Sequence, residues 1–326
     1  MSPNALFFCQ THKKINLPSP RLYVKIADRK GGITINSIDN LFKKCVSSSE
    51  AIVSVAACAD LHVLEACVMA AEMGLADFIL VGDADKTENL AADAGLDISC
   101  FDIMHEPDDI ISCKKAVQLV AQGRATALMK GLVDTSVILK AVLDRETGIR
   151  SDRKLSHIAA FELASYHKLL FMTDAAINIA PSIDDKVQII QNAADALNSL
   201  GIIKPHVALL AAKEKADPKM PVTIDCAEIA KMPFTNCIVD GPLALDCAIS
   251  SEACEIKNIN STVGGDADLL VVPDIEAGNV LYKSLAFLAG ARVGGIVLGA
   301  KRPVIMTSRA DSADSKLIAI ALAVVC

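Results

Sequence analysis

Short apolar segments alternate with amphipathic segments along most of the chain. The apolar runs have the length of β-strands, and segments with helical spacing separate them. They are Ala51–Ala57, Asp77–Val81, Thr126–Met129, Lys168–Met172, His206–Leu210, Cys237–Val239, Leu269–Val272, Gly294–Leu298 and Val304–Met306. Regular alternation of strands and helices predicts an α/β protein with mostly parallel sheets.

The intervening segments carry apolar residues at the three-to-four-residue spacing of a helix that buries one face. Asp185–Leu200 is the clearest case, and Gly201 follows it as a stop signal. Its apolar face is formed by Val187, Ile190, Ala194 and Leu197. The other predicted helices are Leu61–Met73, Asp108–Gln122, Thr135–Leu143, Leu245–Lys257 and Ala277–Ala289, with a last one beginning near Ala313.

A length of 326 residues predicts about two domains, each with its own sheet. Residues 144–154 are mostly charged or polar and mark a natural boundary, after which the sequence alone would place the second domain. Residues 1–36 show no clear period and are predicted to be a weakly ordered N-terminal extension.

Composition narrows the class of protein. Hydrophobic residues make up 52% of the chain, yet no apolar run reaches the ~18 residues of a membrane span, so the apolar residues belong to a core and no membrane partner is expected. Aromatic residues are only 4% and Trp is absent, which is typical of parallel strands packed with Ala, Val, Ile and Leu. A formal net charge of −7 argues against a nucleic-acid partner.

The 11 cysteines do not form a recognisable pattern. They show no Cys-x-x-Cys and no Cys/His cluster at zinc spacing, so neither a disulfide framework nor a metal site is predicted. Several lie in apolar contexts, where reduced cysteine acts as a small hydrophobic residue. The apolar residues 5–9 are too few for a signal peptide. We therefore expect a cytoplasmic protein.

Two predicted strands end in polar turns that open a helix. Pro273–Lys283 follows Leu269–Val272, and Thr307–Ser312 follows Val304–Met306. The carboxyl ends of parallel strands are where ligands bind, and a cation beside a helix start suits an anion such as phosphate. Either segment alone could be an ordinary helix cap, but the two together favour an anion site.

Two further groups extend this hypothesis. Asn279 and Lys283 are four residues apart, so they share one helix face, although they could equally be solvated surface residues. After another strand, a glycine loop leads into a helix whose start offers partial positive charge to an anion. This loop contains Lys130, Gly131, Thr135, Ser136 and, one turn later, Lys140. A plain capped loop is the alternative, since neither a Walker A motif nor Gly-x-Gly-x-x-Gly occurs.

Taken together, these motifs resemble the phosphate acetyl/butyryltransferase family, most closely its butyryltransferase branch. The resemblance runs from about Ile38 to the C-terminus. It is carried by residues 130–136, 172–178, 240–243, 273–283 and 307–312. It implies reversible transfer of a short acyl group, butyryl first, between coenzyme A and inorganic phosphate. Coenzyme A is then a substrate, and no metal or permanently bound cofactor is implied.

The resemblance also implies an architecture. The family shares its fold with isopropylmalate dehydrogenases: two α/β/α domains with mostly parallel sheets and an active site in the interdomain cleft. In that fold the last strand and helix return to the first domain. Domain I would then comprise residues 37–146 with 303–326, and domain II residues 147–302. A homodimer or higher homo-oligomer is expected.

Roles for individual residues follow from the resemblance. Ser308 and Arg309 would bind phosphate and the oxyanion, while the Lys130 loop, Asn279 and Lys283 would complete the pocket. The acetyltransferase branch places a proposed general base seven residues after the Ser, a position occupied here by Ser315. Asp314 is our candidate base, with Asp311, or no base at all, left open. Asp174, Asn178, Asp240 and Asp246 are interpreted as structural, and the histidines receive no role.

Other functions are compatible with parts of the pattern. Within the same family, acetyl, propionyl or branched acyl groups are alternative substrates. An NAD-linked hydroxyacid dehydrogenase shares the fold, but no cofactor fingerprint or divalent-metal set of aspartates is present. A non-catalytic coenzyme A-binding protein would not need the Ser308-Arg309 pair. A covalent acyl-cysteine route lacks a cysteine in the anion loops.

Overall fold

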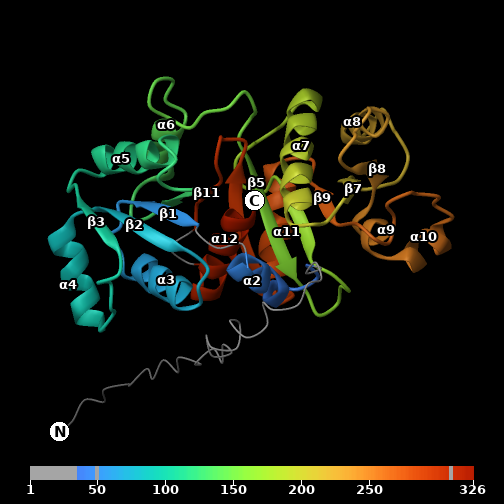
Figure 1. Cartoon of the computed structure of the whole chain (residues 1–326). Helices are drawn as coiled ribbons and strands as arrows, with labels where there is room; N and C mark the ends of the chain where they lie inside the picture. Colours follow the sequence, from blue (N-terminus) through green and yellow to red (C-terminus); the bar gives the residue numbers. More distant parts are fainter. Residues whose placement is uncertain (1–34, 48–50, 308–310) are drawn as a thin grey trace, which may run out of the picture.

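The computed structural model describes residues 35–47, 51–307 and 311–326, so the predicted N-terminal extension lies almost entirely outside it (Figure 1). The described strands form one 11-stranded sheet in the order β3-β2-β1-β4-β11-β10-β5-β6-β9-β7-β8. They are β1 Ile52–Ala56, β2 Asp77–Gly82, β3 Asp102–His105, β4 Ala127–Lys130, β5 Ser156–Glu162, β6 Leu170–Thr173, β7 His206–Leu210, β8 Ile238–Leu243, β9 Leu269–Val271, β10 Arg292–Leu298 and β11 Val304–Ile305.

The sheet consists of two blocks. In the first half (β3-β2-β1-β4-β11) all neighbours are parallel, and β11 pairs with β4 through Val304–Leu128 and Ile305–Met129. In the second half, β6, β9, β7 and β8 are also mutually parallel. Between the blocks, β10 runs antiparallel to both β11 and β5, and β5 runs antiparallel to β6. The two sheets expected from the chain length are therefore joined into one. Strands β10 and β5 make this join, and they pair with backbone groups that separate sheets would expose at their edges.

Helices cover both faces of this sheet. One core cluster unites α2, α3, α7, α8 and α12 with one face. On the other face, α5 and α6 cover the first half, and α9, α10 and α11 cover the second half. Their bounds are α2 Ile38–Ser47, α3 Leu61–Glu72, α4 Ala84–Ala94, α5 Asp109–Ala121, α6 Thr135–Val142, α7 Ile183–Ser199, α8 Pro221–Ile229, α9 Leu245–Ile249, α10 Ser251–Lys257, α11 Ile275–Lys283 and α12 Ala313–Val325. The chain continues from α11 into a short π-helix, η1 Ser284–Leu288.

The C-terminal helix α12 lies at the centre of the molecule (Figure 1). Residues 317–323 of α12 are at most 3% exposed, as expected for a helix that is apolar on every side. It packs against β10, β11, α2 and α3, so it contacts the first half and the strand that joins the two halves. The glycine at position 294 permits this packing, because a Cβ there would lie 2.6 Å from Ile318 Cβ.

The α/β class with a mostly parallel sheet is confirmed, and each of the nine predicted strands is present. The apolar pattern missed β3 and β5, as well as α2, α4 and α8. Strand β5 starts with Ser-His and is rich in Ala, so its composition did not indicate a strand. The predicted helix Leu245–Lys257 is broken at Ser250, which caps α10. None of the helices described is long and apolar enough to cross a lipid bilayer.

Candidate active site

The loop after β4 is fixed by its contact with the end of β1. Gly131 N donates to Ala56 O (2.8 Å), and a Cβ on Gly131 would lie only 2.2 Å from Ala57 O. A glycine is therefore required for this close approach. Within the loop, Lys130 Nζ donates to the carbonyl oxygens of Gly131 (3.2 Å) and Val133 (3.1 Å), which holds the ammonium over the loop.

This loop leads directly into α6. Asp134 occupies the N-cap position, but its side chain makes no capping hydrogen bond, so the first-turn amides are not satisfied by it. Thr135, Ser136 and Lys140 are exposed on the helix. Amides at a helix start, two hydroxyl groups and an ammonium one turn later are the groups that an anion binds. The structure thus brings together five of the predicted residues in one segment.

On the same face of the sheet, α11 carries Asn279 and Lys283, both exposed. Asp274 caps the helix by accepting from Ala277 N (2.8 Å). Gly278 is buried against the turn after β6, where a Cβ would come within 3.0 Å of Asp174 O. The position of α11, and with it that of Asn279 and Lys283, therefore depends on this turn.

Asp174 and Asn178 build that turn. Asp174 Oδ1 accepts from the amides of Ala176 and Ile177 (both 2.9 Å), and its Oδ2 accepts from Asn178 Nδ2 (2.6 Å). Asn178 Nδ2 also donates to Leu155 O (2.8 Å). Both side chains are buried, so they act as supports, in line with the structural role expected for them. Ile177 of the turn packs into the apolar cluster that contains α6, which links the two candidate segments.

Ser308 and Arg309 lie outside the described residues. The segment resumes at Asp311, whose backbone oxygen accepts from the buried Lys316 Nζ (2.6 Å). Burial, and secondarily the charge of Asp311, raise the pKa of Tyr282 to about 12. Burial lowers the pKa of His157, while Asp174 and Asp311 act in the opposite direction. Asp311 therefore lies close enough to Tyr282 and His157 to act on both.

Sequence reasoning assigned no role to His157 or Tyr282. Their ring centroids are 6.1 Å apart, and His157 Nδ1 is buried without a hydrogen-bond partner among the described residues. His157 lies more than 100 residues before Tyr282 and Asp311 in the chain, so no local spacing in the sequence indicates that the three residues meet. The only signal was the location of His157 near the predicted domain junction.

Asp314 is engaged by Arg292. Arg292 Nε donates to Asp314 Oδ2 (3.0 Å) and Nη2 donates to Oδ1 (2.9 Å), so the guanidinium holds both carboxylate oxygens. The same guanidinium also reaches Glu162 (3.0 Å) and Asp39 (3.2 Å). These contacts tie the start of α12 to β10, β5 and α2. Arg292 thus occupies one acceptor position on each oxygen of the Asp314 carboxylate and favours its charged form.

The described cysteines are all free thiols, and none lies in residues 130–136, 173–178 or 272–283. Burial raises the pKa of Cys45 to about 12 and that of Cys113 to about 11. Thiols of this kind are poor nucleophiles. Elsewhere, Glu214, Asp246 and Cys247 offer ligand atoms within 4.8 Å of one another, but Lys257 Nζ already contacts both carboxylates (2.9 Å each).

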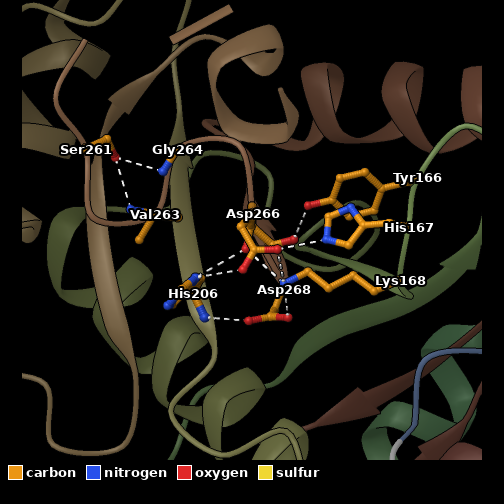
Figure 2. A network of polar contacts seen from close by, with 10 residues as sticks. Tyr166, His167, Lys168, His206, Ser261, Val263, Gly264, Asp266 and Asp268 are labelled. Atoms are coloured by element: carbon orange, nitrogen blue, oxygen red, sulfur yellow. Dashed lines mark hydrogen bonds and ion pairs between the residues drawn. The ribbon is translucent and has the colours of Figure 1, made fainter. Parts of the chain in front are cut away.

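Another polar cluster lies at the opposite ends of the second-half strands (Figure 2). Lys168, His206 and Asp268 stand at the starts of β6, β7 and β9, and Asp266 lies beside them. Lys168 Nζ contacts Asp266 (3.0 Å) and Asp268 (2.7 Å), and His206 N donates to Asp268 (2.7 Å). Because ligands bind at the carboxyl ends of parallel strands, this cluster is structural.

Comparisons with known proteins identify relatives over most of the chain. The sequence profile of a family described as phosphate acetyl/butaryl transferase matches residues 109–324. A phosphate butyryltransferase of Clostridium acetobutylicum is 42% identical over 293 residues, which are 89% of this chain and 97% of the relative. A phosphate acetyltransferase of Rhizobium meliloti is 42% identical over 289 residues, 87% of this chain and 92% of the relative. A crystal structure of a branched-chain phosphotransacylase from Enterococcus faecalis superimposes with a TM-score of 0.77 at 36% identity, covering 84% of this chain and 98% of that one.

Proposed function

The chain belongs to the phosphate acetyl/butyryltransferase family, and we propose that butyryl is its preferred acyl group. It catalyses reversible transfer of an acyl group between coenzyme A and inorganic phosphate. The butyryl preference is supported by the butyryltransferase relative and by Lys130 and Asp311-Ser312, which follow the butyryl branch. The equally identical acetyltransferase and the branched-chain phosphotransacylase make acetyl and branched groups the competing candidates.

The decisive experiment is a comparison of kcat/KM for acetyl-, butyryl- and isobutyryl-CoA with phosphate, followed by thiol release. One methylene in an apolar pocket changes discrimination by about 1–3 kcal/mol, so the two methylenes that acetyl lacks predict a preference for butyryl over acetyl of at least about 10–200-fold. Isobutyryl is an isomer of butyryl, so the two are distinguished by shape alone. A higher kcat/KM for acetyl-CoA or isobutyryl-CoA than for butyryl-CoA would refute the butyryl assignment and leave the reaction class intact.

We place the active site between α6 and α11. Phosphate would bind the exposed first turn of α6 with Thr135, Ser136 and Lys140, beside the Lys130-Gly131 loop. Asn279 and Lys283 would approach from α11, and Ser308 and Arg309 would bind phosphate and the oxyanion. The observation that carries this placement is that both candidate helices cover the same face of one sheet and pack on the turn after β6, where Gly278 of α11 meets Asp174 and Ile177 joins the cluster that contains α6.

Chemically, we propose a direct transfer within a ternary complex. An oxygen of hydrogen phosphate attacks the thioester carbon and forms the C–O bond. The C–S bond breaks, and the leaving thiolate takes up the proton that the phosphate loses. In the reverse direction the thiol must lose that proton, and a thiol of pKa near 8.5 is only a few per cent ionised at pH 7. Holding both substrates together supplies much of the rate. No metal or resident cofactor takes part in this scheme.

Two aspartates compete for the role of base. Asp314 remains the candidate from sequence, but its oxygens are both bonded to Arg292. The charge of Asp311 acts in the direction of a higher pKa on Tyr282 of α11 and on His157, so Asp311 lies near both rings. We propose Asp311 for proton transfer on this proximity to α11, and Asp314 as the anchor of α12 on its two bonds with Arg292.

The enzyme is further proposed to be a cytoplasmic homodimer. Large apolar side chains are exposed on one surface of α11 and η1: Val280 (66%), Phe287 (76%) and Leu288 (86%). A cavity of about 550 Å³ beside them is lined by Leu281 and Leu285 among others. An exposed apolar patch of this kind favours association with a second copy. The pairing of β11 with β4 supports two domains, residues 37–146 with 303–326 and residues 147–302.

A further inference from the structure

A polar cavity of about 390 Å³ lies where the chain crosses between the two halves of the sheet. One crossing, residues 143–155, leads from α6 to β5, and the other, residues 299–303, leads from β10 to β11. The crossings are tied together, since Lys301 N donates to Ile149 O (2.8 Å) and Arg150 pairs with Ala300. We call this the crossover cavity; both crossings and α7 line it.

The crossover cavity offers unpaired positive charge. Lys301 and Arg302 line it and are exposed, and neither side chain makes an ion pair or hydrogen bond with any described residue. Arg153, also at the cavity, is paired with Asp195. Asp152 is the carboxylate there that offsets part of this charge. A guanidinium and an ammonium on one cavity bind a carboxylate or a phosphate group well.

Asn192 of α7 adds an independent observation on the same wall. It is only 4% exposed, and its Nδ2 donates to Lys154 O (2.8 Å) and Ser156 Oγ (3.0 Å). Because a backbone carbonyl can only accept, these contacts fix which way the amide points. Its Oδ1 is left buried with no partner among the described residues. An unsatisfied acceptor in such a wall indicates a missing donor.

We propose that the crossover cavity binds a small anion that also carries a hydroxyl or ammonium group. The carboxylate or phosphate would bind Lys301 and Arg302, and the donor group would bind Asn192 Oδ1 after a small adjustment of the wall. The volume lies in the range of small-molecule sites, about 300–1,000 Å³. The α7 wall belongs to the core cluster on the sheet face opposite α6 and α11, and none of the described residues proposed for acyl transfer lines the cavity, so the two sites are separate.

Occupancy of this site would change the acyl-transfer rate. The crossing 299–303 leads through β11 to Asp311, and the other crossing starts at the end of α6. A ligand that contacts Lys301, Arg302 and α7 therefore fixes both connections between the halves that carry the proposed substrate groups. Such coupling is a difference in ligand affinity between two arrangements of the halves.

Binding is tested with two named probes, malate for the carboxylate class and glycerol 3-phosphate for the phosphate class. Succinate, which lacks the hydroxyl of malate, tests the contact with Asn192. The variant Lys301→Gln/Arg302→Gln is compared with the wild type and with Arg124→Gln/Lys231→Gln, which removes the same charges from exposed positions elsewhere. Calorimetric titration and the probe-induced rise in Tm are measured, and neither depends on activity.

We expect at least one probe to bind the wild type and the control equally, and the Lys301/Arg302 variant about tenfold more weakly or worse. Succinate should bind more weakly than malate. Equal binding to all three proteins would place the anion elsewhere, for example in the acyl-transfer site, and would overturn the proposal. Absence of binding by both probes at millimolar concentration would overturn it as well.

Coupling is tested by initial rates with butyryl-CoA and phosphate. The bound probe should change kcat or KM of the wild type and of the control, and leave the Lys301/Arg302 variant unchanged, while basal rates of the three proteins agree. Binding without any effect on rate would overturn the coupling. A protein inactive toward every acyl-CoA would refute the acyl-transfer function, whereas the binding titrations would still decide on the cavity.

Discussion

Replacing Asp314 by Asn is expected to reveal an anchor and not a base. The amide oxygen of Asn can still accept one hydrogen bond from Arg292, but its NH₂ group faces the second donor, so one charge-assisted bond is lost. Hydrogen bonds to charged groups contribute about 1.5–3 kcal/mol each. Removing one partner of a fully buried ion pair costs more, about 3–5 kcal/mol.

The surroundings of Arg292 indicate that the loss of unfolding free energy lies at the lower end of these values. Its side chain is 35% exposed, and Glu162 and Asp39 remain within 3.0 and 3.2 Å to balance its charge. We therefore expect Asp314→Asn to lower the free energy of unfolding by about 1.5–2 kcal/mol. Arg292→Gln should cost more, because it leaves three carboxylates facing one another. The double variant should be less destabilised than the sum of the two, because the residues share one interaction.

Two assays distinguish the roles. Urea unfolding gives the stability, and the rate of acyl-CoA formation from acyl phosphate and coenzyme A gives the pH profile. For Asp314→Asn the profile should keep its shape at temperatures where the variant is folded. The matched control, Asp311→Asn, should lose most rate below the pKa of the thiol and recover as pH rises and the thiol ionises unaided.

The reasoning would be refuted by the reverse pattern. If Asp314→Asn showed unchanged stability and a rate defect that disappears at high pH, Asp314 would be the base and its fork with Arg292 would open during turnover. If both aspartate variants kept normal profiles, ionisation of the thiol would need no carboxylate.

The remaining predictions address separate parts of the protein. Arg309→Ala should lower kcat by about 10²–10³, with partial rescue by Lys, and a near-normal kcat would remove it from the oxyanion site. Burial raises the pKa of Asp266, but hydrogen bonds and charges from Lys168 and two histidines outweigh it and lower that pKa overall. The stabilisation by this carboxylate is therefore present above the ordinary carboxyl pKa and is lost as pH falls. In urea unfolding, the difference in unfolding free energy between the wild type and Asp266→Asn should shrink on acidification. Phe287→Glu with Leu288→Glu should raise the dimer dissociation constant measured by sedimentation at least about tenfold. Ile203→Glu, also at an exposed apolar position, should leave that constant unchanged. A wild type that sediments as a monomer would contradict the dimer.

The strands were predictable because nearly every one is buried on both faces and therefore reads as a continuous apolar run. Strand β3 was not predicted because it has only two apolar residues, Ile103 and Met104, between Asp102 and His105. Helix α4 escaped for a related reason: two of its 11 residues are buried, so little apolar periodicity exists. The joining of the two parallel blocks by β10 could not be read from the sequence, because pairing partners leave no local pattern.

For the candidate site, local sequence motifs identified the segments but not the contacts between them. A glycine before a helix start pointed to the loop at Lys130, and its contact with Ala57 explains why only glycine fits. The fork between Arg292 and Asp314 joins residues on different elements, as does the approach of Asp311 to His157. Pairwise geometry of this kind depends on the completed fold, so the sequence could offer aspartates near the end of the chain but could not rank them.

The position of α12 has a consequence for biosynthesis. The helix follows every other described element in the chain, yet it packs against α3 and β11 of the first half and against β10, which joins the halves. At about 5–20 residues per second, the ribosome needs roughly 10–30 s to pass from residue 146 to residue 303. During that interval the apolar face of α3 that α12 later covers has not yet met α12. The first half is thus completed only after α12 has been made, and a chain that stops before α12 leaves α3, β11 and β10 without this cover.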